Sequence, residues 1–169
     1  MPLFLLDANV LIDAGRDYYP LEMVPEFWDW LVHHGSAGSI KLPLEIYEEV
    51  CDGNDPLAEW LRDRSVRDAI VMADEVDVEL VARAVSDGYA SDLTDDEVLK
   101  IGRDPFLVAY ALVAPQSRYV VTTEGSKPAR RRANRHLPDV CGMFGISVCN
   151  TFELTRRLGF RTSWRRPAE

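Results

Sequence analysis

Three short apolar runs, each leading into polar residues, limit what this chain can fold into. Residues 3–6 are Leu-Phe-Leu-Leu and lead into Asp7, and residues 119–123 are Tyr-Val-Val-Thr-Thr and lead into Glu124. Residues 146–149 form a third run of this kind. Runs without polar alternation are typical of strands buried on both faces of a parallel sheet. The sequence therefore predicts a buried parallel sheet that contains these strands.

Helical periodicity occupies most of the chain between these runs. Apolar residues recur there at three- and four-residue steps, and two further extended pieces are expected at residues 40–44 and 69–72. Strands that alternate with helices form βαβ units. The expected fold is therefore α/β, a three-layer α/β/α arrangement with a central parallel sheet. The predicted helices begin after Asp7 and lie over residues 21–34, 46–50, 57–61, 76–88, 105–112, 140–144 and 152–158.

One domain, residues 1–169, is expected to account for the whole chain. Its 169 residues suit a single compact domain, and no repeat or linker divides them. The basic tail, about residues 160–169, is expected to be loose.

Within the predicted helix 21–34, Phe27 and Trp28 fit the buried face, whereas Trp30 points elsewhere and is expected at an interface.

The chain has no segment suited to a membrane or to export. It lacks a run of about 18 or more apolar residues, and its apolar start is too short for a signal peptide and has no basic residue. The three cysteines are an odd number without metal-type spacing. Reduced thiols and a cytoplasmic location are therefore expected.

Charge is divided unevenly along the chain. Residues 1–101 carry 7 Lys and Arg against 23 Asp and Glu, whereas residues 102–169 carry 12 against 5, within a net charge of −9. An asymmetry of this size suggests an acidic part and a basic part with different roles. A mixed solvated surface is the alternative that charge alone leaves open.

Four carboxylates from separate segments are expected to meet at one edge of the sheet. Asp7 and Glu124 directly follow strands. Asp104 opens the helix before the second of these strands, and Glu49 lies on the third predicted helix, where the adjacent Glu48 is an alternative. The carboxyl ends of parallel strands form the edge at which open α/β sheets bind ligands. The sequence thus predicts an acidic site at this edge.

Such a site suits a hard divalent cation. Carboxylates packed together repel one another, and a cation removes that repulsion. Mg²⁺ and Mn²⁺ prefer oxygen ligands, and either ion activates a bound water and steadies the charge that develops on a phosphate. One or two such ions are expected. The polar residues expected to support the site are Asn9, Thr122, Thr123 and Ser126.

Each acid also has a purely structural explanation. Asp7 and Asp104 stand where helices begin, so each is a natural N-cap. Glu124 alone would be an exposed turn residue, and at least one of the adjacent glutamates on the third predicted helix is solvated. The acids of residues 92–97 are expected to form a solvated face or a helix cap. The metal hypothesis depends on the four acids acting together.

A basic segment follows the last of these acids directly, with five Lys and Arg within residues 127–135. Cations beside an acidic metal site suit a phosphodiester cutter, because they hold the nucleic-acid backbone. A flexible loop, or a docking site for an acidic partner, is the alternative. No histidine spacing suggests a metal site or a catalytic base, and no nucleophile elbow or P-loop is present. The cations expected to bind RNA are Lys127, Arg130, Arg131, Arg132 and Arg135.

These motifs resemble those of PIN-domain nucleases. Residues 5–12, an apolar strand followed by Asp-Ala-Asn, resemble the family's first motif, and Glu49 resembles its second acidic position. Asp104 resembles the third, an Asp that opens an alanine-rich helix. Residues 120–124, Val-Val-Thr-Thr-Glu, resemble the fourth. The resemblance covers about residues 3–155.

The resemblance implies a Mg²⁺- or Mn²⁺-dependent endoribonuclease, often the toxin of a toxin–antitoxin pair and often a homodimer. It makes the four acids metal ligands and catalytic residues. Residues 27–31 and 57–60 are similar to an uncharacterised bacterial branch of that family. Two departures leave substrate and metal geometry open: Glu124 replaces the usual Asp, and the insert near residues 55–95 exceeds that of the smallest toxins.

Two other functions remain in view. A PIN-like fold that binds RNA or a protein partner through residues 127–135 without turnover is the non-enzymatic alternative. An aspartyl-phosphate phosphatase would also place an Asp after the first strand. That chemistry needs a second Asp two residues later, where this chain has Asn9.

Overall fold

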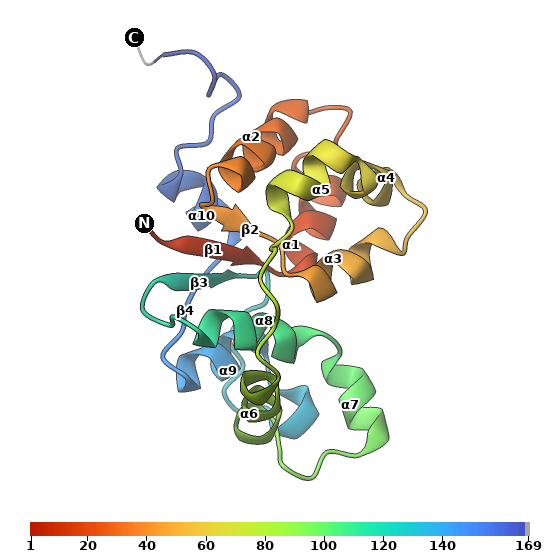
Figure 1. Cartoon of the computed structure of the whole chain (residues 1–169), viewed down its shortest axis with the longest axis vertical. Helices are drawn as coiled ribbons and strands as arrows, with labels where there is room; N and C mark the ends of the chain where they lie inside the picture. Colours follow the sequence, from red (N-terminus) through yellow and green to blue (C-terminus); the bar gives the residue numbers. More distant parts are fainter. Residues whose placement is uncertain (168–169) are drawn as a thin grey trace.

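The computed structural model describes residues 1–167 and contains one four-stranded parallel sheet (Figure 1). The strand order is β2-β1-β3-β4, so the chain starts in the middle of the sheet and later adds strands on the other side of β1. The predicted α/β fold with a central parallel sheet is confirmed. The strands are β1 (Leu3–Leu6), β2 (Ile40–Lys41), β3 (Arg118–Val121) and β4 (Ser147–Cys149).

Helices cover the sheet in two groups, and the strands lie between them in Figure 1. The first group is α1 (Ala8–Asp13) with the π-helical turn η1 (Ala14–Tyr18), α2 (Pro25–Ser36), α3 (Leu44–Cys51), α4 (Pro56–Arg62) and α5 (Arg64–Ile70). The second group is α6 (Val78–Gly88), α7 (Asp95–Ile101), α8 (Asp104–Leu112) and α9 (Leu137–Met143), with the 3₁₀ turn η2 (Arg132–Asn134). The last helix, α10 (Thr151–Arg157), follows β4. This arrangement confirms the three layers.

The register of the central strands brings their carboxyl ends to one edge. Leu6 pairs with Val121, and Val121 pairs with Cys149. The next backbone bonds continue this alignment, since Asp7 N donates to Val121 O at 2.9 Å and Thr122 N donates to Cys149 O at 3.1 Å. The residues that follow β1 and β3 therefore emerge side by side.

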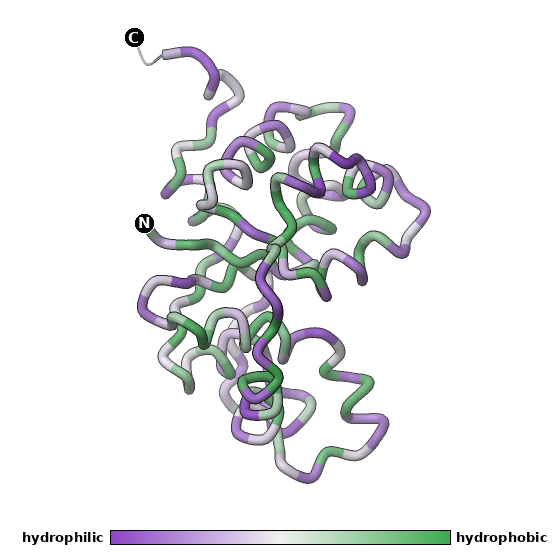
Figure 2. The backbone as a smooth tube through the Cα atoms, viewed as in Figure 1, coloured by the Kyte–Doolittle hydropathy of each residue, from purple (hydrophilic) through white to green (hydrophobic). Residues whose placement is uncertain are grey.

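The sheet forms the centre of the hydrophobic core. Phe4, Leu5 and Leu6 of β1 and the last two residues of β3 are buried on both faces. Figure 2 shows hydrophobic residues along the central strands and hydrophilic residues on the outer turns. Burial on both faces explains why these strands show no polar alternation.

Residues 69–72 were predicted to form a strand, and this prediction is wrong. Helix α5 continues to Ile70, and only Val71 makes a single parallel bridge, with Leu42. Asp63 starts this helix, because its side chain accepts hydrogen bonds from the backbone of Ser65 and Val66. A short apolar run does not distinguish a strand from the end of a buried helix.

The tail was predicted to be loose, but residues 160–165 pack against α2. The ring of Phe160 lies 5.3 Å from that of Trp30, and Trp164 Nε1 donates to the backbone oxygen of Glu26 at 3.0 Å. Trp30 is consequently only 1% exposed, so the predicted interface role for this side chain is wrong. Residues 168–169 of the predicted tail lie outside the described residues.

Within residues 1–167, no helix is both long and apolar enough to cross a membrane. The three cysteines, Cys51, Cys141 and Cys149, are all free thiols.

Candidate functional site

Asp7 leaves β1 at the N-cap position of α1, but its carboxylate does not cap the helix. Instead, Asp7 Oδ2 accepts a hydrogen bond of 2.8 Å from Thr122 Oγ1. Both side chains are buried, with Asp7 4% and Thr122 1% exposed. The capping explanation therefore accounts for where Asp7 stands in the chain but not for where its carboxylate points.

Thr122 joins the first and the last of the four acids. Its hydroxyl donates to Asp7 and accepts a hydrogen bond of 3.2 Å from the backbone N–H of Glu124. The Glu124 carboxylate is fixed at its other end, since Oε2 accepts from the backbone N–H of Leu137 at 2.9 Å. Of the four predicted supporting residues, Thr122 is the one bonded directly to one of the four site acids.

Asp104 was predicted to be the N-cap of its helix, and this prediction is wrong. Arg103 occupies the cap position, while Asp104 is the first residue of α8 and makes no capping hydrogen bond. Its carboxylate is thus left for another role. Burial raises the pKa of Asp104 to about 8, with further increases from the negative charges of Asp7, Glu124 and Glu49.

The same repulsion acts on Asp7. Burial raises the pKa of Asp7 to about 6, the Thr122 hydrogen bond lowers it, and the charges of Glu124 and Glu49 raise it again. Acids that shift one another's pKa in this way lie within electrostatic reach. The structure therefore brings Asp7, Glu49, Asp104 and Glu124 to one region.

Glu48 and Glu49 have different surroundings. Glu48 forms an ion pair of 3.4 Å with Arg103. Glu49 is exposed, and its charge reaches both Asp7 and Asp104. Of these two adjacent residues, Glu49 is thus the better candidate for the second acid.

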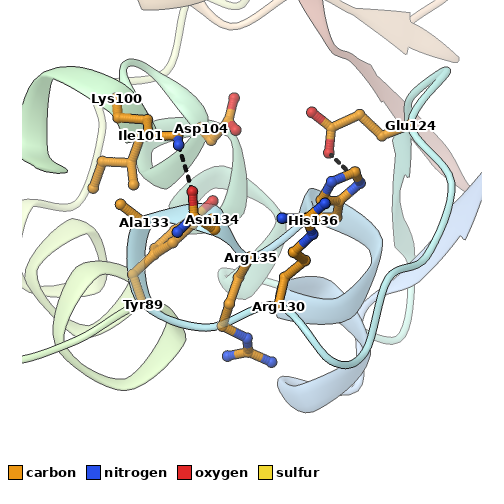
Figure 3. A pocket seen from close by; sticks show the side chains of 10 residues that line it. All are labelled: Tyr89, Lys100, Ile101, Asp104, Glu124, Arg130, Ala133, Asn134, Arg135 and His136. Carbon is orange, nitrogen blue, oxygen red and sulfur yellow. Dashed lines mark hydrogen bonds and ion pairs between the residues drawn. The ribbon is translucent and has the colours of Figure 1, made fainter.

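A cavity of about 300 Å³ opens beside the acids (Figure 3). Asp104 and Glu124 stand on opposite sides of it, with their carboxylates directed toward the space between them. Tyr89, Lys100 and Arg130 line the remaining wall and the mouth. The cavity thus combines two carboxylates with hydrogen-bond donors and cations.

The chemistry of the acidic set fits a hard divalent cation, because every candidate donor is a carboxylate oxygen. Among residues 1–167, however, no three His, Cys, Asp or Glu side chains are arranged closely enough to surround an ion as they stand. Thr122 and the backbone N–H of Leu137 each engage one carboxylate oxygen of the set. Closing the set around an ion requires these side chains to move.

The remaining predicted supporting residues are not bonded to the acids. Ser126 Oγ donates to Asp139 Oδ1 at 2.5 Å, which closes the loop onto α9. Thr123 lines a separate small cavity beside Tyr18. Asn9 is partly exposed, and its side chain makes no hydrogen bond within residues 1–167.

The five cations of residues 127–135 divide into two groups. Arg132 and Arg135 are engaged by the fold: Arg132 binds Asp92 and Glu97 at 2.7–2.8 Å, and Arg135 donates to the backbone oxygen of Gly88. The side chains of the other three are exposed and make no ion pair within residues 1–167. These three are Lys127, Arg130 and Arg131.

Three titratable side chains of the cavity were not among the predicted site residues. His136 lies beside Glu124, with 3.9 Å between Nδ1 and Oε2. Lys100 donates to Asn134 at the rim, and Tyr89 lies just after α6 with 7% of its surface exposed. No spacing marks them, since α6, α7 and the 127–136 loop meet only in the folded chain.

Comparison with known proteins places the chain in a family whose function is unknown. No curated protein matches the chain. Residues 4–162 match DUF4411, a domain of unknown function, and that description names no nuclease. The resemblance to PIN-domain nucleases therefore rests on the motifs quoted above. Because the match spans nearly the whole sequence, the chain belongs to the DUF4411 family.

Proposed function

We propose that this chain is a divalent-metal-dependent endoribonuclease that hydrolyses RNA phosphodiester bonds. The observation that carries the proposal is that acids from separate segments meet at one edge of the sheet: Thr122 bonds both Asp7 and the backbone of Glu124, and Glu124 and Asp104 line one cavity. Asp7 and Asp104 both have raised pKa values, and both respond to the charges of Glu49 and Glu124. A fold that keeps such a set of acids together has a use for a cation there.

In this proposal, Asp7, Glu49, Asp104 and Glu124 hold Mg²⁺ or Mn²⁺. The ion, when bound, supplies an activated water and stabilises charge on the phosphate. Thr122 orients Asp7 through its 2.8 Å hydrogen bond. The backbone N–H groups of Glu124 and Leu137 fix the fourth acid relative to β3 and α9. Such supporting bonds orient ligands and tune their basicity.

RNA is the proposed substrate because exposed cations stand beside the acids. Arg130 lines the cavity that contains Asp104 and Glu124, and Lys127 and Arg131 are exposed on the same loop. Contacts of this kind neutralise backbone phosphates without reading sequence. By its resemblance to PIN-domain toxins, the proposal extends to an antitoxin partner, a homodimer and a cytoplasmic location.

Cleavage of a labelled RNA with Mg²⁺ or Mn²⁺, and with EDTA, tests the reaction. Asp7→Asn and Asp104→Asn are expected to lower the rate by about 100-fold or more while the chain remains folded. Asp68→Asn is the matched control, since Asp68 is exposed and its one ion pair within residues 1–167 is with Arg64 on α5. Equal cleavage by wild type and both site variants, or cleavage unaffected by EDTA, would contradict the proposal.

The open arrangement of the acids favours a second candidate, an RNA- or protein-binding module without turnover. Glu49 is exposed, and within residues 1–167 no three His, Cys, Asp or Glu side chains are close enough together to coordinate a metal ion. Calorimetric titration with Mn²⁺ separates the two functions. A binding module gives no heat that depends on Asp7 and Asp104, whereas the nuclease binds Mn²⁺ and loses this binding in Asp104→Asn.

A further inference from the structure

Tyr89 carries a buried hydroxyl that has no hydrogen-bond partner. The residue follows α6 directly and is 7% exposed. Its hydroxyl is buried, and nothing within residues 1–167 accepts from it or donates to it. Tyr89 nevertheless lines the cavity that contains Asp104 and Glu124 (Figure 3). Tyr89 therefore brings an unpartnered hydroxyl to the wall of a space that a ligand can fill.

A buried polar group without a partner destabilises a folded protein, and native proteins rarely retain one without a reason. Removing such a group is neutral or stabilising for the ligand-free protein. A ligand that bonds the group is a reason for the protein to keep it. A tyrosine hydroxyl keeps its proton at neutral pH, so it donates to an acceptor oxygen. The fitting occupant of this cavity therefore presents an oxygen acceptor toward Tyr89.

The other donors of the cavity define the charge of that occupant. Lys100 and Arg130 stand at its mouth, and Lys100 is held there by a hydrogen bond to Asn134. With Arg135, the cations of the lining outnumber its two carboxylates, Asp104 and Glu124. Together with the phenol donor they suit an oxyanion, and cation contacts are how proteins hold phosphate. The volume of about 300 Å³ lies at the small end of ligand pockets, which suits one phosphate with its sugar.

We infer that this cavity is a phosphate subsite, in which Tyr89 donates a hydrogen bond to a non-bridging phosphate oxygen and Lys100 and Arg130 neutralise its charge. The phosphate belongs to the nucleotide next to the cleaved bond, and this part of the inference rests on the proposed function. Asp104 and Glu124 line the same cavity, on opposite sides of it. The subsite thereby sets the distance between the bound strand and the acids.

The test measures binding of three probes to the full chain in Mg²⁺ buffer: inorganic phosphate, uridine 5′-monophosphate and uridine. Wild type is expected to bind both phosphate probes and not uridine. Tyr89→Phe and Arg130→Gln are each expected to weaken uridine 5′-monophosphate binding by about tenfold, the loss of one hydrogen bond to a charged group. Arg64→Gln is the charge-matched control and is expected to bind like wild type.

Three results overturn the subsite: wild type binds neither phosphate probe, it binds uridine as tightly as uridine 5′-monophosphate, or Tyr89→Phe binds like wild type. RNA cleavage is measured on the same samples. If the expected binding is seen but RNA is not cleaved, the proposed nuclease activity is contradicted and the phosphate subsite is supported. If RNA is cleaved but the expected binding is not seen, the phosphate subsite is contradicted and the nuclease activity is supported.

A second measurement compares two buried tyrosines. The Tyr110 hydroxyl donates to the backbone oxygen of Asp74 at 3.3 Å, so Tyr110→Phe removes a bond that is made. Its thermal midpoint without ligand is expected to fall, whereas that of Tyr89→Phe is expected to stay or rise. A fall in Tyr89→Phe as large as that in Tyr110→Phe would show a partner within the chain and overturn the inference.

Discussion

The hydroxyl of Thr122 donates a 2.8 Å hydrogen bond to the carboxylate of Asp7, across 115 positions of sequence. The bond joins the end of β1 to the end of β3, where the parallel register places the two residues side by side. It leaves the capping position of α1 without a side-chain bond from Asp7. The chain thus uses a neighbouring strand, rather than a helix terminus, to orient its most buried acid.

Thr122→Val is expected to lower both stability and cleavage. It leaves a buried carboxylate oxygen without its partner, at a cost of about 1–3 kcal/mol in the free energy of unfolding. Burial raises the pKa of Asp7 to about 6 and the Thr122 bond lowers it, so removing the bond raises that pKa further. The acid limb of the pH–rate profile therefore moves to higher pH. Thr122→Ser, which keeps the hydroxyl, is expected to retain the wild-type profile, and a Thr122→Val profile that superimposes on wild type would contradict this role.

In EDTA, the free energy of unfolding is expected to fall as pH rises from about 4 to 8. Burial and neighbouring charges raise the pKa of Asp104 from 3.8 to about 8, so the folded chain keeps a proton that the unfolded chain has released. Because the folded state binds more protons than the unfolded state in this range, the free energy of unfolding falls as pH rises, until Asp104 ionises in the folded state as well. Asp104→Asn removes the contribution of Asp104, while that of Asp7, whose pKa is about 6, remains. The variant is expected to raise the thermal midpoint at pH 8 by roughly 5 °C, with little change at pH 4.

Bound Mn²⁺ is expected to make wild type, rather than Asp104→Asn, the more stable protein at pH 8. Added Mn²⁺ is expected to stabilise wild type at pH 8 more than at pH 5, because a cation binds the ionised carboxylates. Scanning calorimetry of both proteins at the two pH values checks the expectation. Equal stabilisation of Asp104→Asn and wild type by Mn²⁺ would place the ion elsewhere.

Two adjacent arginines are expected to respond in opposite ways to substitution. Arg132 binds Asp92 and Glu97, which lowers the pKa of Glu97 to about 2 and fixes the start of α7. Arg132→Ala is expected to lower the thermal midpoint and speed hydrogen exchange in α7. Arg131→Ala is expected to leave stability unchanged and reduce RNA affinity, with a smaller salt dependence of binding. The same loss of affinity in both variants at unchanged stability would show that Arg132 also contacts RNA.

The parts of the molecule that the sequence predicts are those that local patterns encode. Runs buried on both faces mark β1 and β3, and the acids that follow them are found by position alone. Tyr89 escapes prediction because it reaches the cavity through the packing of α6 against α8 and α9. Arg132 likewise meets its carboxylate partners 35 and 40 positions away, which no spacing rule reports.

Glu124→Asp, which supplies the residue that PIN-domain nucleases usually carry here, is expected to lower activity rather than raise it. The glutamate carboxylate reaches the backbone N–H of Leu137 at 2.9 Å while its own N–H bonds Thr122. An aspartate is one methylene shorter, so it cannot keep this bond and still face Asp104 across the cavity. Loss of a supporting bond to a metal ligand lowers affinity or rate by about 10–100-fold. RNA cleavage and Mn²⁺ binding measure the effect, with the exposed Glu79→Asp as control, and activity at or above wild type would show that the longer side chain has no role.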